Sequence, residues 1–466
     1  MKVRTTPSEM DVMIPAAFAP FLDHAPLCVL TRAVLERLFL PARLDQLFRD
    51  TAQRQYEQDL LFSQVAELML AVALQTEPSV YAAYKRRAAD LPVSDQAVYD
   101  KLRGMEPGVS AALVRDSAEQ VGPVIEALGA TVPPLLAGYR ARIVDGNHLG
   151  KTERRLKPLR TTWAAALPGK VLAVYDQERD LVSHALLTPD GHAQERSLFD
   201  EVLALARPKD LWIADRNFAT LGFLAGLARA EAAFVIRQHG TLKGEPAGAR
   251  RSVGRSETGA VYEQDVAFAH DGRVLPLRRV SVVLDRPTRD GDTEVHVLTN
   301  LPAAAADGAR VAELYRRRWT IENRFYEVAQ TLNCEPATLA YPQAALFAFC
   351  LGLVASNAVA LLKAALRSVH PADDVAAMSS YYMAEEVRTT FAGMMIVLPA
   401  AVWAAFGRLP VGSFAAGLRR LAGRVDPKRY RKAKRGPKRP PPSKARYRNG
   451  GHVSTHRLLE QQKRRH

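Results

Sequence analysis

The sequence predicts an α/β protein with a helical N-terminal region, a core of short strands and helices, a β-rich insertion and a basic C-terminal tail. Three observations predict this class. The first 135 residues have the apolar spacing of helices, the next hundred alternate short apolar strands with amphipathic helices, and residues 238–300 change to a period of two. We therefore divide the chain into domains at 1–135 and 136–425, with the insertion at about 238–300 and the tail at 426–466.

Positive charge is concentrated in that tail. The 466-residue chain has a formal net charge of +15 and a pI of about 9.8. Residues 426–466 contain 15 Lys and Arg against 2 acids, so the other 425 residues are nearly neutral at +2. A Lys/Arg/Pro-rich segment of this kind is expected to be disordered when free, and its charge indicates a polyanionic partner, most simply nucleic acid.

Cysteine usage and hydropathy point to an intracellular protein. The three cysteines are far apart and lack zinc-ligand spacing, which fits a reducing compartment. The N-terminus has no apolar signal core. Residues 344–362 imitate a membrane span in length and composition. Because Ser356 and Asn357 interrupt this segment, we predict a buried core helix and no membrane association.

The N-terminal region is read as short helices joined by tight turns. A long apolar helix is predicted over 59–74 and another over 78–88, and Ser94-Asp95 is expected to cap a helix over 96–102. The segment VSDQAVYDKL is the best candidate for a DNA-recognition helix. A plain helical bundle explains the same pattern, and both interpretations stay open.

The core begins near residue 140 with the predicted order β-β-β-α-β-α-β. Strands are predicted over 142–145, 170–175, 181–187, 211–215 and 233–237, and helices over 195–207 and 220–231. In the insertion the predicted strands are 261–268, 275–284 and 294–298. Residues 341–425 are expected to be helical.

Two of the core strands run into an aspartate, Asp145 in IVDGN and Asp215 in WIADRNF. Ligands of α/β sheets bind at strand ends, so both carboxylates are candidate site residues. Other interpretations compete, because Asp145-Gly146-Asn147 could form a turn and Asp215 could cap the next helix. Further acids nearby are interpreted as solvated, namely Asp176, Asp180 and Glu153.

A third carboxylate, Glu322, is predicted on one helix from Tyr315 to Leu332. At about 100° per residue, Tyr315 and Arg318 share a face with Glu322 beside an apolar stripe. The stripe consists of Leu314, Ile321, Phe325, Val328 and Leu332. We expect Trp319 to have a packing role. We expect His148 either to support a ligand residue or to lie in a loop, and not to be a ligand itself.

Three converging carboxylates repel one another, and a divalent cation would relieve the repulsion. Oxygen ligands favour Mg²⁺ or Mn²⁺, and two such ions suit phosphodiester displacement. The alternative for the helix is a surface ion-pair network.

The segments IVDGNHL, WIADRNF and YRRRWTIE closely resemble the three signatures of the DDE transposases of the insertion sequence 4 family. The third signature, Y-x₂-R-x₃-E, is matched by Tyr315, Arg318 and Glu322. The resemblance covers about 140–365. It implies a ribonuclease H-like catalytic core with a β insertion, and it implies Asp145, Asp215 and Glu322 as catalytic metal ligands. It also implies that Tyr315 and Arg318 contact the ends of the transposon.

One position departs from the family pattern. A Lys commonly follows six residues after the glutamate, and here that residue is Ala329; Tyr326 occupies the other position where some relatives carry a Lys. A phosphate contact is either lost or supplied by Arg324, Arg316 or Arg317.

The sequence therefore predicts a bacterial, cytoplasmic, nucleoid-associated cut-and-paste transposase. It would act as a dimer on double-stranded DNA, at terminal inverted repeats and at the target, with a hairpin intermediate implied by the resemblance. Alternatives are an inactive or regulatory DNA-binding relic and a nuclease of the same fold without strand transfer. Further residues expected to contact DNA are Arg216, Arg324, Lys428, Arg429, Arg431, Lys432, Lys434 and Arg435.

Overall fold

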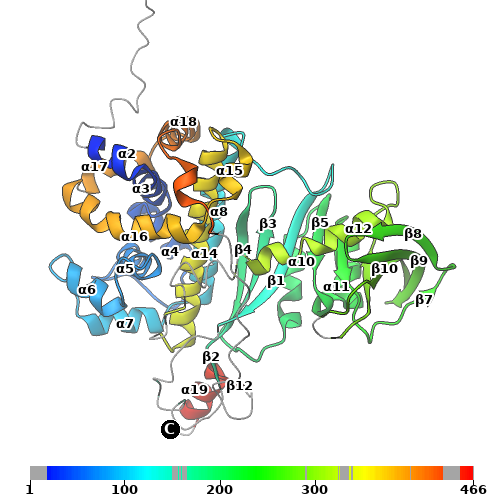
Figure 1. The fold of residues 1–466 in the computed structure, drawn as a ribbon. Helices are drawn as coiled ribbons and strands as arrows, with labels where there is room; N and C mark the ends of the chain where they lie inside the picture. The colour runs from blue at the N-terminus through cyan, green and yellow to red at the C-terminus, as the bar shows by residue number, and fades with distance from the viewer. Residues whose placement is uncertain are drawn as a thin grey trace, which may run out of the picture.

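The fold was analysed in a computed structural model. It describes residues 18–149, 165–288, 291–323, 339–398, 400–433 and 452–464, with the single residues 156, 159, 325, 335 and 336. A helical part lies beside one large mixed sheet, and the β-rich insertion extends that sheet away from the helices (Figure 1). The predicted α/β class is confirmed at this level.

The N-terminal helices follow the predicted pattern. They are α2 (Ala19–His24), α3 (Pro26–Leu38), α4 (Pro41–Thr51), α5 (Phe62–Ala73), α6 (Val80–Arg87), α7 (Asp95–Arg103) and α8 (Pro107–Ala127). The predicted cap of α7 is present, because the Ser94 hydroxyl accepts a hydrogen bond from the backbone N–H of Ala97 at 3.3 Å.

The core of the sheet contains three antiparallel strands followed by two parallel ones. In spatial order they are β4 (Leu181–Thr188), β3 (Lys170–Asp176), β1 (Arg140–His148), β5 (Asp210–Ala214) and β6 (Ala233–Arg237). Strand β1 is antiparallel to β3 and parallel to β5, and β5 is parallel to β6. All five strands were predicted. Between them lie η2 (Glu195–Leu198), α10 (Phe199–Leu205), η3 (Arg216–Phe218) and α11 (Leu221–Arg229).

The insertion continues this sheet. Its strands are β7 (Glu245–Pro246), β8 (Arg251–Ser256), β9 (Gly259–His270), β10 (Arg273–Leu284) and β11 (Glu294–Thr299). Strand β11 pairs antiparallel with β6, so hydrogen bonding passes without a break from the core into the insertion. The three predicted insertion strands are present with longer bounds, and β7 and β8 were not predicted.

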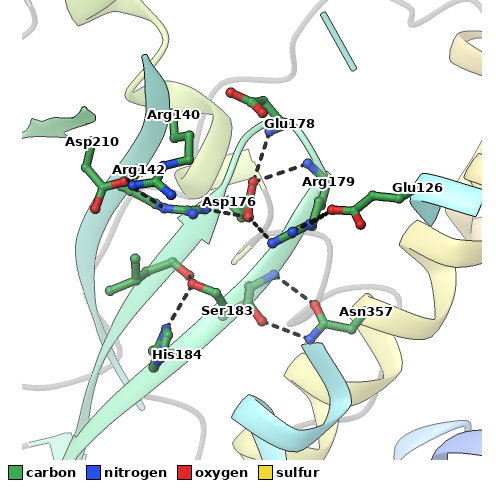
Figure 2. A network of polar contacts seen from close by, with 12 residues as sticks. Glu126, Arg140, Arg142, Asp176, Glu178, Arg179, Ser183, His184, Asp210 and Asn357 are labelled. Atoms are coloured by element: carbon green, nitrogen blue, oxygen red, sulfur yellow. Dashed lines mark hydrogen bonds and ion pairs between the residues drawn. The ribbon is translucent and has the colours of Figure 1, made fainter. Parts of the chain in front are cut away.

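The C-terminal helices are organised around α14 (Pro342–Arg367), with α15 (Ala372–Ala376), α16 (Ser380–Val397), α17 (Ala400–Gly407) and α18 (Val411–Ala422). Among the described helices, α14 alone is long and apolar enough to cross a membrane, and 94% of its most apolar stretch is buried in the protein. The predicted core helix is therefore confirmed. The Asn357 amide joins α14 to β4 by bonding both the N–H and the C=O of Val182, at 2.8 and 2.9 Å (Figure 2).

The two faces of the sheet bury two different apolar clusters. Alternate residues of each strand point to opposite faces. Ile143 and Ile213 join the large cluster that contains α3, α5, α8 and α14. Val144 and Trp212 join a smaller cluster with α10 and α11. Helices from both ends of the chain thus cover one face of the sheet, and the helices between its strands cover the other.

The predicted continuous helix from Tyr315 to Leu332 is wrong in its first half. Helix α12 (Gly308–Arg316) ends at Arg316, the chain turns, and residues 319–323 are helical again. The predicted apolar stripe is nevertheless buried at Leu314, Ile321 and Phe325. The turn therefore changes the direction of the side chains without exposing the apolar ones.

The prediction of a disordered tail is wrong for residues 427–433 and 452–464. The segment η4 (Pro427–Tyr430) docks on the helical part, where Tyr430 is buried and its carbonyl accepts from the Ser379 N–H at 2.7 Å. Strand β12 (His452–Ser454) pairs with β2 (Ala165–Leu167), and α19 (Thr455–Lys463) follows it. The prediction rested on the average basic composition of the tail. It did not detect these short segments, which contain buried side chains and paired backbone.

Of the acids expected to be solvated, Asp176 is buried and Asp180 is partly buried. Asp176 is 4% exposed and forms ion pairs with Arg142 and Arg179. Asp180 accepts a hydrogen bond from the Tyr175 hydroxyl and lies 3.8 Å from Arg367. The hairpin turn that carries both acids packs against neighbouring elements, which a turn signal in the sequence does not reveal. Glu153 lies outside the described residues.

Candidate active site

The register of two parallel strands places Asp145 and Asp215 side by side. In the β1–β5 pair Ile143 is opposite Ile213, and each aspartate lies two residues further along its strand. Asp215 follows the last residue of β5 and caps η3, accepting from the Asn217 N–H at 2.8 Å. The capping interpretation of Asp215 is therefore correct, and it is compatible with a place in the site.

Asp145 does not end its strand, contrary to the prediction. Strand β1 runs on to His148 because its antiparallel partner β3 continues to Lys170. The alternative of a turn at Gly146 is excluded for the same reason.

Arg318 joins Glu322 to this pair. One guanidinium nitrogen, Nη1, lies 2.6 Å from Asp145 Oδ2 and 2.6 Å from Glu322 Oε1. The side chains of Arg318, Asp145 and Glu322 are 11%, 14% and 34% exposed. The turn after α12 makes this possible, because it presents Arg318 and the first turn of the next helix to the end of β1.

Burial makes the negative charge at this site costly. It raises the pKa of Asp145 to about 7, with Asp215 and Glu322 adding to the effect and Arg318 opposing it. Burial lowers the pKa of Arg318, but Asp145, Tyr315 and Glu322 outweigh it and hold this pKa above its usual range. Burial also raises the pKa of the Tyr315 hydroxyl. The site therefore has more buried negative charge than Arg318 compensates.

The carboxylates suit a hard divalent cation. The donors are oxygen atoms, as Mg²⁺ and Mn²⁺ prefer. Among the described residues no three acidic, His or Cys side chains converge on one point, and the Arg318 nitrogen lies between Asp145 and Glu322. A positive charge thus already occupies the space between two of the three acids. That Asp145, Asp215 and Glu322 hold a metal stays a prediction.

Residues 137–358 match the family model of the transposase DDE domain. All three acids lie within this match, which supports a DDE transposase. A solved structure, the cryo-EM structure of a piggyBac transposase synaptic complex with hairpin DNA, is similar at 12% identity and a TM-score of 0.38, covering 83% of this chain and 85% of that chain. No curated protein matches the chain in sequence.

Besides the three candidate acids, Glu195 at the start of η2 is a fourth acid close to Asp145 in the fold. The sequence did not identify it. Its carboxylate lies so close to Gly146 that a Cβ at this position would collide with it. Burial and the charge of Asp215 raise the pKa of Glu195, while Lys170 lowers it. The glycine directly after the first aspartate was the only sequence signal for such a close approach.

The basic and aromatic residues near the acids differ in exposure. Tyr315 is mostly buried beside Arg318, whereas Arg216 is exposed directly after Asp215. Trp319 is 59% exposed and lies 5.3 Å from the Arg318 guanidinium, so the expected packing role is wrong. Arg316 forms an ion pair with Glu257 of the insertion at 2.6 Å.

The tail residues that the structure describes at 427–432 pack against the C-terminal helices. Lys428, Arg429, Arg431 and Lys432 lie in and after η4, which contacts α15 and α16. Lys434 and Arg435 lie outside the described residues, as do Arg324, Tyr326 and Ala329. A role for any of these residues in DNA binding stays a prediction.

Proposed function

We propose that this protein is a DNA transposase of the insertion sequence 4 type, acting by cut-and-paste transposition of its own element. The observation that carries the proposal is the register of β1 and β5, which sets Asp145 and Asp215 side by side, with Glu322 joined to them through Arg318. The match to the transposase DDE domain over 137–358 supports it. Three antiparallel and two parallel strands in this order also support a ribonuclease H-like core.

The side chains at the site have separate tasks in this proposal. One or two divalent cations held by Asp145, Asp215 and Glu322 would activate a water or a 3′-hydroxyl and would stabilise the leaving oxygen. Arg318 holds Asp145 and Glu322 in place and, when a metal takes over their charge, becomes free to contact a DNA phosphate. Without a cation, Asp145 binds a proton near neutral pH, because its pKa is about 7.

The proposed substrate is double-stranded DNA at the element's terminal inverted repeats, bound by a dimer. Arg216 follows Asp215 in the chain, and Arg317 and Trp319 flank Arg318; all three are exposed and suit phosphate contacts and base stacking. The basic tail would add affinity that falls with salt. The freed 3′-hydroxyl would then attack the opposite strand and later the target.

The deciding experiment is Mg²⁺- or Mn²⁺-dependent cleavage and joining of DNA that carries the flanking ends of the gene, with Asp215→Asn as control. Cleavage and joining that disappear in the control are the expected result. Cleavage without joining would indicate a nuclease of the same fold rather than a transposase. Binding without cleavage would favour a DNA-binding relic, and it would direct attention to Ala329 and to the Arg318 bridge.

A further inference from the structure

A second site lies at the opposite end of the sheet from Asp145. There a cavity of about 450 Å³ opens between α8, the first residues of β1 and β5, the β3–β4 pair and the end of α10. Pockets of this size accommodate small ligands. Its walls contain five arginines, which are Arg115, Arg140, Arg142, Arg179 and Arg207. The transposase DDE domain match assigns no role to this end of the sheet.

The acids in the cavity are already neutralised. Arg142 forms an ion pair with Asp176 and lies 3.9 Å from Asp210 (Figure 2). Arg179 lies 3.2 Å from Asp176, and Arg140 lies 3.1 Å from Asp210. The two buried acids in the wall therefore each have two arginine partners.

The two remaining arginines of the lining differ, because only Arg115 has an acidic partner, Glu119, which also lines the cavity. The Arg207 guanidinium donates to the carbonyls of Ala204 and Ala206 at 2.8 and 3.0 Å, and within the described part of the chain no acid lies within ion-pair distance of it. Arg115 lies 3.8 Å from Glu119, and both side chains are more than half exposed. Both are placed to bind an anion that enters the cavity.

His184 also lines the cavity, and its ring is neutral. The Ser183 hydroxyl donates its hydrogen to the Val174 carbonyl at 3.1 Å, so the 3.1 Å contact between Ser183 Oγ and His184 Nδ1 requires a proton on Nδ1 (Figure 2). Nε2 of the neutral ring is then an acceptor. Burial and the charges of Arg115, Arg142 and Arg207 lower the pKa of this histidine to about 4.

Trp212 is buried behind the cavity lining and has an unsatisfied donor. Its side chain is 1% exposed, and its indole N–H has no hydrogen-bond partner among the described residues. A buried donor without a partner is costly, so an acceptor atom here would be stabilising. The apolar lining residues that keep exposed surface are Ala118, Pro123 and Leu205.

We propose that this cavity binds the phosphate of a nucleoside monophosphate, either free or as the 5′-terminal nucleotide of a DNA strand. Arg207 and Arg115 bind the phosphate oxygens by charge-assisted hydrogen bonds. Pro123 and Leu205, apolar lining residues with exposed surface, can contact the base or sugar. The two sources share this chemistry, and they differ only in whether a strand continues out of the open side of the cavity.

The test is calorimetric titration of the full chain with deoxyadenosine monophosphate, deoxyadenosine, and a short single strand with or without a 5′-phosphate. We expect one site that requires the phosphate. Arg207→Gln should weaken binding about 10-fold or more, because a charge-assisted contact is lost. Arg115→Gln is a second, exposed variant that should weaken it in the same direction.

Two matched controls separate this site from diffuse charge and from the carboxylates. Arg273→Gln removes an exposed arginine on β10, and Asp145→Asn changes the other end of the sheet; neither should alter binding. Binding of the phosphorylated strand but not of the free nucleotide identifies a strand terminus, and the reverse identifies a free nucleotide. The proposal is overturned if neither probe binds at millimolar concentration, or if Arg207→Gln and Arg273→Gln behave alike.

Discussion

The two ends of strand β1 differ in how their buried charges are balanced. At its start, Arg140 and Arg142 face Asp210 and Asp176, and each of these buried acids has two arginine partners. Five residues further along from Arg140, Asp145 lies near Asp215 and Glu322, and Arg318 bridges two of these three acids. The first end of β1 is thus rich in cations, and the second is rich in acids.

This difference indicates which ligand each end can accept. Buried charges of one sign without enough partners are costly unless a ligand of the other sign binds. The acidic end therefore suits a metal cation, and the arginine-rich end suits a phosphate. Because both sites share β1 and β5, substitutions at one end can be matched with substitutions at the other.

The largest expected effect is on DNA cleavage. Asp145→Asn, Asp215→Asn and Glu322→Gln should each lower the cleavage rate by at least about 10³-fold, because each removes a proposed metal ligand. The measurement is single-turnover cleavage in Mg²⁺, with circular dichroism to verify folding. Asp176→Asn is the matched control at the arginine-rich end and should keep most of the activity of the folded fraction. Retained cleavage in any of the first three variants would remove that residue from the site.

The second prediction concerns the bridging arginines and stability. Arg318→Ala should lower the free energy of unfolding by about 2–4 kcal/mol, because it leaves Asp145 and Glu322 near each other with no cation between them. Arg142→Ala should cost less, about 1–2 kcal/mol, since Arg179 and Arg140 remain beside Asp176 and Asp210. Urea denaturation without divalent metal measures both. Equal losses would contradict the difference in charge balance.

A third prediction follows from the raised pKa of Asp145. An acid whose pKa is raised to about 7 in the folded protein disfavours folding once the unfolded chain ionises, above about pH 4. Asp145→Asn should therefore match the wild type at pH 4. It should gain stability as the pH rises and be more stable by about 1–4 kcal/mol above pH 7. Unfolding free energies in metal-free buffer from pH 4 to 8 check this.

Asp190 provides a control for which the expected effect of pH on stability has the opposite sign. Although partial burial opposes it, hydrogen bonds from Ser454, His192 and Arg457 hold the pKa of Asp190 below its ordinary value. The stability that this carboxylate contributes is present above its ordinary pKa and disappears as the pH falls. Asp190→Asn should therefore lose stability at pH 7 and match the wild type at the acidic end. If Asp145→Asn and Asp190→Asn both increased the free energy of unfolding at pH 7, the pKa shift of the replaced carboxylate would not be the cause.

Local sequence signals predicted the strands and identified the three candidate acids because both depend on short-range patterns. Apolar runs before Asp145 and Asp215 defined β1 and β5, and their spacing to Glu322 gave the family resemblance. The register that makes the two aspartates neighbours follows from pairing between strands that lie about 70 residues apart. No local sequence pattern encodes this register between the two strands.

What the sequence could not predict depends on contacts across the fold. The approach of Glu195 to Gly146 and the burial of Asp176 arise from packing between separate elements. Trp319 was assigned to packing because a continuous helix placed it near the apolar stripe. The turn after Arg316 exposes it instead.

The smallest effect on stability is expected for this tryptophan. Trp319→Ala should change the free energy of unfolding by no more than about 0.5 kcal/mol, because the side chain is 59% exposed and its neighbour Arg318 keeps both ion pairs. Its counterpart Trp212 is buried beside the arginine-rich cavity. Trp212→Ala should lower the free energy of unfolding by about 3–5 kcal/mol. If Trp319 stacks on a DNA base, its loss should weaken binding of the transposon end by about 1–3 kcal/mol. Fluorescence anisotropy with end DNA measures this, and unchanged affinity would leave the exposed ring without a role in DNA binding.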